Sequence, residues 1–121
     1  MNFLIALLAF LITNPILSQE INISDKNGNK QGKWKKYFKN GNIKYEGQFI
    51  DNYPVGIFKF YYKTSELKSE KEFFHQGKAA ATRFYNKDGK IMSIGLYVDE
   101  VKDSTWVYFN SDSIVILSED Y

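Results

Sequence analysis

Cysteine is absent from this 121-residue chain, and histidine and proline are scarce, with one and two residues respectively. Without cysteine the chain can form no disulfide, thiolate metal site, cysteine nucleophile or lipid-modified cysteine anchor. A single histidine leaves little from which to build a histidine metal site or a catalytic triad. Charge of neither sign dominates, since 16 basic residues face 14 acidic ones. The composition is that of one small folded domain.

The N-terminus carries an unbroken apolar run from Phe3 to Ile12. Ten residues suit the apolar core of a signal peptide and are too few to span a membrane. Pro15 ends the run, and Ile16 and Ser18 stand where a signal peptidase reads its −3 and −1 positions. No Lys or Arg precedes the run, so the alternative is a buried N-terminal helix or strand. We predict a signal peptide over residues 1–18.

Cleavage after Ser18 would leave a mature chain that begins at Gln19. The rest of the sequence contains no second apolar run long enough to anchor it in a membrane. We therefore expect an exported protein, either periplasmic or secreted, without a lipid tether.

Equivalent residues recur every 24 positions through the remainder of the chain. Three columns show this register: Tyr37, Tyr61, Tyr85 and Phe109; Ile43, Leu67, Ile91 and Val115; and Phe49, Phe73, Tyr97 and Tyr121. Two turn columns follow the same spacing: Gly41, Ser65, Gly89 and Ser113; and Asp51, His75 and Asp99. The register predicts a lead-in segment, 19–31, and a repeat domain, 32–121, with copies 32–55, 56–79, 80–103 and 104–121.

Each copy has the pattern of a β-hairpin. In the first copy, Lys33 to Phe38 and Ile43 to Ile50 read as strands, and residues 39–42 read as a tight turn. The second strand alternates apolar and polar residues, as a half-buried antiparallel strand does. Gly47 stands on its apolar face, where we expect an aromatic side chain of the next hairpin to cross the backbone. The predicted fold is all-β: an elongated single-layer antiparallel meander of about eight strands in four hairpins.

These motifs resemble MORN repeats, and more closely the bacterial variant of that repeat. The core of the resemblance is Tyr45-Glu46-Gly47-x-Phe49 followed by Gly56-x-Phe58, with Gly32-x-Trp34 and Asn40-Gly41 in the first copy. It extends from Gly32 to Tyr121, although the third copy has Ala80 in place of the leading glycine. The resemblance implies a stack of hairpins that binds or scaffolds, with antitoxin-like relatives among bacterial members. It carries no shared catalytic residues.

The sequence offers no convincing catalytic group. His75 occupies a turn column that holds Asp51 and Asp99 in other copies, so we interpret it as a turn residue. The acidic pairs Asp99-Glu100 and Glu119-Asp120 are adjacent, and adjacent strand residues point to opposite faces. We therefore predict no catalytic, cofactor-binding or metal-binding residues, and no cofactor.

Basic residues concentrate near the start of the repeats. Seven lysines and no acid lie between Lys26 and Lys44, whereas six acids and one lysine lie between Asp99 and the C-terminus. The basic hairpin carries four candidate contact residues: Trp34, Lys35, Lys36 and Tyr37. Such a surface could contact an acidic protein or an anionic membrane surface. Nucleic acid is not expected because of export, and the alternative is a solvated face that protects an edge strand.

The third copy is apolar on both faces of its second strand. Ile91, Ser93, Gly95 and Tyr97 continue the aromatic side, whereas Met92, Ile94, Leu96 and Val98 face the other way. Either the segment around Ile21 and Ile23 or the run Ile114 to Leu117 covers this second face, or it is an exposed binding patch. We take Ile94 and Leu96 as further candidate contact residues.

We therefore expect an exported, non-enzymatic repeat protein that binds a protein or cell-envelope component through its sheet surface. The alternative is an antitoxin-like or immunity protein that neutralises a toxin by binding it. The oligomeric state is left open.

Overall fold

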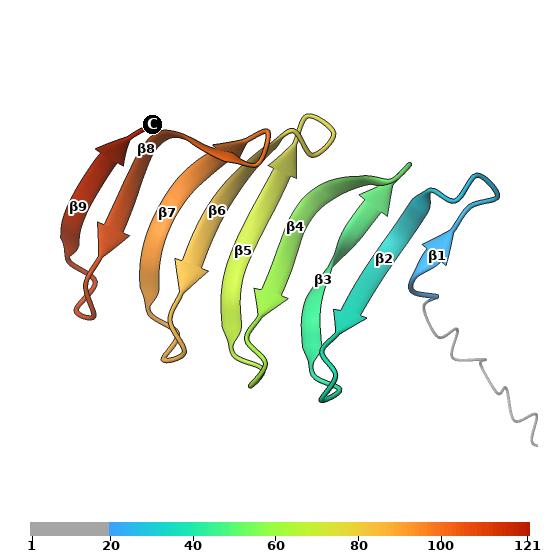
Figure 1. Cartoon of the computed structure of the whole chain (residues 1–121), viewed down its shortest axis with the longest axis horizontal. Coiled ribbons are helices and arrows are strands. Elements are labelled where there is room, and N and C mark those ends of the chain that lie inside the picture. The colour runs from blue at the N-terminus through green and yellow to red at the C-terminus, as the bar shows by residue number, and fades with distance from the viewer. Residues whose placement is uncertain (1–19) are drawn as a thin grey trace, which may run out of the picture.

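A computed structural model describes residues 20–121, which form one open antiparallel sheet (Figure 1). The predicted signal peptide lies outside the described residues. Nine strands follow one another in chain order across the sheet: β1 (Ile23–Ser24), β2 (Lys30–Tyr37), β3 (Ile43–Ile50), β4 (Tyr53–Tyr61), β5 (Leu67–Phe74), β6 (Ala79–Tyr85), β7 (Ile91–Val98), β8 (Val101–Phe109) and β9 (Val115–Asp120). The predicted all-β, single-layer meander is confirmed.

The strands differ from the prediction in number and in the bounds of β2, which ends at Tyr37 and not at Phe38. β3 has the predicted bounds, whereas β2 begins at Lys30, three residues earlier than expected. The ninth strand is the short β1, in which Ile23 lies opposite Gln31 of β2. Apolar and polar residues alternate over too few positions in the lead-in segment to predict this two-residue strand.

The turns at one end of the hairpins repeat with the sequence. The residues of the first turn column, Gly41, Ser65, Gly89 and Ser113, have φ angles of 89°, 85°, 80° and 61°. Each donates its backbone N–H to the carbonyl three residues earlier, as Gly41 does to Phe38 at 3.0 Å. At the other end, Asp51-Asn52 and Asp99-Glu100 are two-residue turns with positive φ at both positions. His75 also lies in a turn, as predicted.

Opposite faces of the sheet have different roles. The side chains that are almost fully buried all lie on one face, which we call the aromatic face: Phe58, Ser69, Ala80, Thr82, Ser93 and Trp106. Rings pack edge to face around two of them, with Phe58 5.0 Å from Phe73 and Trp106 5.0 Å from Tyr97. A sheet without a second layer has only its own side chains with which to exclude water, and these rings do so.

Two of these rings lie directly on glycines of the preceding hairpin. A Cβ atom built on Gly47 would lie 2.5 Å from the Phe58 ring, which confirms the expectation for this glycine. A Cβ atom on Gly95 would lie 2.0 Å from the Trp106 ring. Only glycine permits so close an approach of ring to backbone.

The middle of the aromatic face breaks this pattern. The column of Gly47 and Gly95 holds Lys71 in the second copy, and Thr82 lies opposite it where an aromatic stands elsewhere. The Lys71 ammonium lies 5.4 Å from the Phe60 ring centre and 4.8 Å from that of Tyr97, so it joins two aromatic clusters. Burial among these rings lowers the pKa of Lys71.

The other face of the sheet, which we call the charged face, is covered by no element of residues 20–121. β1 lies beside β2, far from β7, and β9 continues the sheet beside β8 (Figure 1). The expectation that Ile21 and Ile23 or Ile114 to Leu117 cover β7 is therefore wrong, because both segments extend the single layer. Met92 and Ile94 remain 40% and 37% exposed, in keeping with the alternative of an exposed patch.

Substituting Gly95 by alanine should destabilise the sheet by about 1–3 kcal/mol, because the new methyl group collides with the Trp106 ring. Urea unfolding measures this cost. A Trp106→Leu background serves as the control, since the smaller side chain leaves room for the methyl group. Equal costs of Gly95→Ala in both backgrounds would show that the ring contact is not the cause.

Candidate functional site

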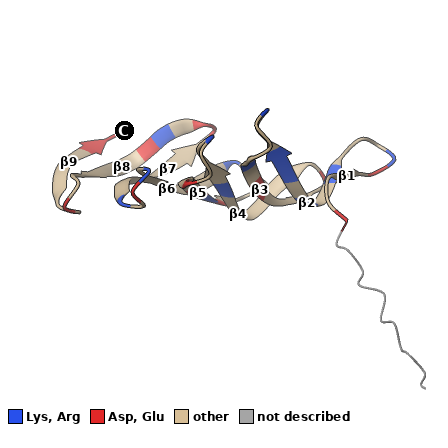
Figure 2. Ribbon diagram, turned by 90° about the horizontal axis from the view of Figure 1, so that it is seen from below, with Lys and Arg blue, Asp and Glu red and all other residues tan. Residues whose placement is uncertain are grey.

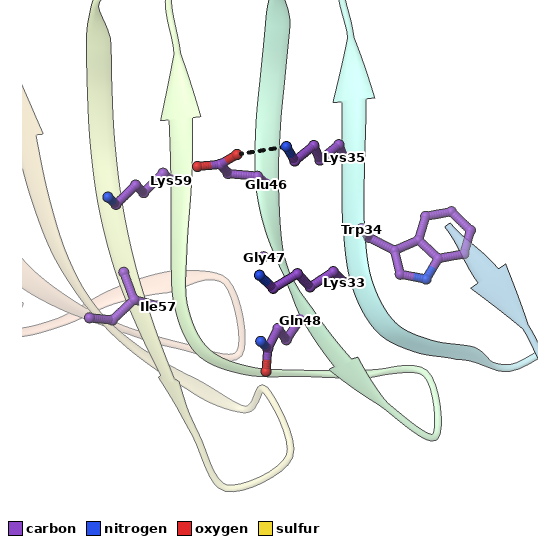
Figure 3. A pocket seen from close by; sticks show the side chains of 8 residues that line it. All are labelled: Lys33, Trp34, Lys35, Glu46, Gly47, Gln48, Ile57 and Lys59. Atoms are coloured by element: carbon purple, nitrogen blue, oxygen red, sulfur yellow. Dashed lines mark ion pairs between the residues drawn. The ribbon is translucent and has the colours of Figure 1, made fainter. Parts of the chain in front are cut away.

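A hollow opens on the charged face above strands β2 to β4 (Figure 3). Its volume is about 310 Å³. The residues around it are Lys33, Trp34, Lys35, Glu46, Gly47, Gln48, Ile57 and Lys59. Three ammonium groups thus surround a space that holds one carboxylate, and the field inside the hollow is positive.

A row of alternating charge crosses the face through this hollow. Cross-strand partners follow in the order Lys35, Glu46, Lys59, Glu70, Arg83 and Ile94. The Lys35 ammonium lies 3.9 Å from a carboxylate oxygen of Glu46. Each acid therefore stands between two cations on neighbouring strands, an arrangement that stabilises a sheet surface. The row ends at an apolar residue, Ile94.

Tyrosine hydroxyls hold both acids of the row in place. Tyr61 donates to Glu46 at 3.0 Å, and Tyr85 donates to Glu70 at 2.9 Å. Burial, followed by the bond to Glu46, raises the pKa of Tyr61 to about 12. Burial and the Glu70 carboxylate likewise raise the pKa of Tyr85. The two bonds are one repeat apart, so the row is a built feature of the hairpins and its two acids are held in place.

A second hollow of about 340 Å³ adjoins the first above strands β4 to β7. It is lined by Ile57, Glu70, Glu72, Ala81, Thr82, Arg83 and Ile94. Two carboxylates and one guanidinium make this hollow negative. Ile57, 55% exposed, lines both hollows and separates the positive one from the negative one.

The six predicted contact residues do not share one surface. Lys35, Ile94 and Leu96 belong to the charged face. Trp34 and Lys36 belong to the aromatic face, because neighbouring strand residues alternate between faces. Tyr37, 52% exposed, lines a hollow with Lys44 near the hairpin turn.

Trp34 has a structural role. Its indole N–H donates to the Ile23 carbonyl at 3.1 Å, and its ring packs edge to face on Phe49. Figure 3 shows the indole turned toward β1, so that Trp34 reaches only the rim of the first hollow. The side chain joins the lead-in strand to the sheet.

Several residues of the site were missed by sequence analysis: Lys33, Glu46, Gln48, Ile57, Lys59, Glu70, Glu72 and Arg83. A signal for the charge row exists, because Lys35, Glu46, Lys59, Glu70 and Arg83 are separated by alternating intervals of 11 and 13 residues. These intervals add up to the 24-residue period. Residues at such intervals meet across successive strands, whereas an inspection of lysine runs along the chain does not find them.

Charge also differs between the ends of the sheet (Figure 2). Lysines mark β2 and β3, and acidic residues mark the C-terminal strand β9. Within residues 20–121, no group of three or more His, Asp or Glu side chains is placed to hold a metal ion. That part of the chain also contains no helix long and apolar enough to cross a membrane.

Comparison with known proteins identifies the first two hairpins. The family model described as MORN repeat variant matches residues 30–51 and 54–75. These ranges contain β2 with β3 and β4 with β5. No curated protein and no solved structure matches the chain. The resemblance to MORN repeat variants is thus confirmed for the first two copies.

Raising the pH should weaken the contact between Tyr61 and Glu46. Because the folded-state pKa of about 12 exceeds the usual value near 10, the neutral hydroxyl contributes stability that is complete below pH 10. That contribution is lost as the pH rises through 12. Urea midpoints measured from pH 8 to 12 should therefore fall more for the wild-type protein than for Tyr61→Phe.

Tyr37→Phe is the matched control, since it removes the same hydroxyl at the equivalent but half-exposed position. It should keep the wild-type pH dependence. If Tyr61→Phe also keeps it, the hydrogen bond to Glu46 does not stabilise the sheet.

Proposed function

We propose that this protein is a non-enzymatic binding protein whose charged face contacts a partner protein. One observation carries the proposal: two adjoining hollows of opposite charge lie on a sheet face that no element of residues 20–121 covers. The match to a repeat variant supports a binding role. Lys35, Ile94 and Leu96 are the contact residues from the sequence analysis that lie on this face.

The aromatic and charged faces have different roles, and this difference supports the assignment of the binding face. The aromatic face is filled by rings that pack on one another and on backbone, so its side chains serve folding. The charged face holds its acids in fixed positions through Tyr61 and Tyr85. A surface with fixed charges loses little side-chain entropy when a partner binds.

We further propose that the protein acts outside the cytoplasm after removal of residues 1–18. The apolar run from Phe3 to Ile12 supports this part of the proposal. The alternative partner is a toxin, in which case the protein would be an antitoxin-like or immunity protein that uses the same face.

Photo-crosslinking in cells that naturally make the protein tests the surface. A benzophenone amino acid at Ile57, between the hollows, should yield a covalent adduct with a partner protein. The same group at Lys36, an exposed site on the aromatic face, is the matched control and should yield none. Adducts from position 36 alone, or from neither position, would contradict the assignment of the binding face.

Intact mass measured on separated cell fractions tests export. We expect a species that begins near Gln19 outside the cytoplasm. A full-length species that begins at Met1 in the cytoplasm would rule out export and would favour the antitoxin-like alternative.

A further inference from the structure

We infer that the charged face binds a protein segment with a defined order of side chains: an acidic residue, an apolar residue and a basic residue. This inference rests on the proposed function, because it specifies what part of a partner the same face would hold. It follows from the sign of each hollow, from the residue between them and from the spacing of the strands.

The first hollow suits the acidic residue. Lys33, Lys35 and Lys59 face it, and its one carboxylate, Glu46, is already occupied by the Tyr61 hydroxyl and by the Lys35 ammonium. Figure 3 shows Lys33 reaching from β2 across to β3, beside Gln48, whereas Lys59 extends from β4 on the side away from β3. A carboxylate that enters the hollow beside Lys33 gains a charge-assisted hydrogen bond, and the Lys59 side chain can turn toward it.

The second hollow suits the basic residue. Glu70 and Glu72 outnumber the single cation Arg83, and Glu70 already accepts the Tyr85 hydroxyl. Glu72 is exposed and points to the same side of the sheet. A lysine or arginine of the partner would lie between these carboxylates, while Ile94 would contact its aliphatic stem.

Ile57 selects the apolar residue. More than half of its surface is exposed, at the boundary that the two hollows share. Burying an apolar side chain on Ile57 would also exclude water from the charged contacts on both sides, which strengthens them.

Strand spacing sets the interval between the three side chains. Neighbouring strands lie about 4.8 Å apart, so the centre of the first hollow, over β3, is about 12 Å from the centre of the second, between β5 and β6. An extended segment advances about 3.3 Å per residue, and residues i, i+2 and i+4 point to one side. A segment that crosses the strands therefore fits with its acid at i, its apolar residue at i+2 and its base at i+4.

The change of sign across the face argues against a membrane or a nucleic acid as the occupant. A nucleic acid and an anionic membrane surface both carry negative charge well beyond the first hollow. Such a ligand would place phosphates against Glu70 and Glu72, whereas a protein segment can match both signs.

A selection of random twelve-residue peptides for binding to the full chain tests the order of side chains directly. We expect enriched peptides to carry acid, apolar residue and base at i, i+2 and i+4, in either direction along the peptide. Fluorescence anisotropy with the most enriched peptide should show at least tenfold weaker binding to the double variant Lys33→Glu/Lys59→Glu. The double variant Glu70→Gln/Glu72→Gln should bind at least threefold more weakly.

Two controls separate lost contacts from lost folding. Lys36→Glu makes one such charge reversal, on the same strand as Lys33 but on the aromatic face, and it should bind within twofold of the wild type. A peptide whose acid is replaced by lysine should bind Lys33→Glu/Lys59→Glu better than it binds the wild-type protein.

Three results would overturn the inference: no enriched peptides, enriched peptides without an acid, or binding that Lys33→Glu/Lys59→Glu leaves unchanged. If one of these three results is obtained while position 57 still crosslinks in cells, the protein binds a partner but not through this order of side chains. Ordered peptides without a crosslink in cells would keep the inference and contradict the proposed function.

Discussion

The contact of an aromatic ring with the backbone of a glycine on the neighbouring hairpin is the interaction on which this sheet depends. A single layer has no second sheet or helix against which to bury its apolar side chains. Phe58 and Trp106 solve this problem by lying flat over Gly47 and Gly95, so that backbone serves as the packing surface. Two-stranded hairpins are marginal in water, and these contacts extend across the boundary between hairpins.

Concentrating all packing on one face has a consequence for the other. Because the buried side chains belong to the aromatic face, the charged face is not needed to exclude water. Its row of alternating charge is restrained by tyrosine hydroxyls and cross-strand partners, which keep it ordered without burying it. A surface that is ordered but exposed can bind a partner at little cost in conformational entropy.

The sequence predicted much of the fold, because alternation in Ile43–Ile50 and the recurrence of turn residues are local signals. It also identified Gly47 as the place where a ring would cross, since a glycine among bulky neighbours on an apolar face leaves room for one. The site was harder to predict. Trp34, Lys35 and Lys36 look like one basic cluster along the chain, but alternation sends them to two faces.

Other features depend on pairing across strands, which a reading of consecutive residues does not reveal. The charge row depends on the register that places Glu46, Lys59 and Glu70 side by side, and the sequence marks it only by the intervals between these residues. Ile94 is exposed because β1 and β9 lie beside the sheet and not over β7, and the composition of these segments does not predict their positions. The role of Lys71 was missed for the same reason, because its ring partners lie on the strand before it in chain order and on a strand that is not its direct neighbour.

Lys71 also changes what counts as the building unit of this protein. Glycine beneath a ring, a bulge in the register and a two-residue turn occur together at β3–β4 and again at β7–β8, 48 residues later. Between them, the β5–β6 register runs without a shift and Lys71 and Thr82 replace the glycine and the ring. Packing thus repeats at twice the period of the sequence. A longer relative would therefore be expected to gain or lose hairpins in pairs, since a pair carries a complete aromatic cluster and a single hairpin does not.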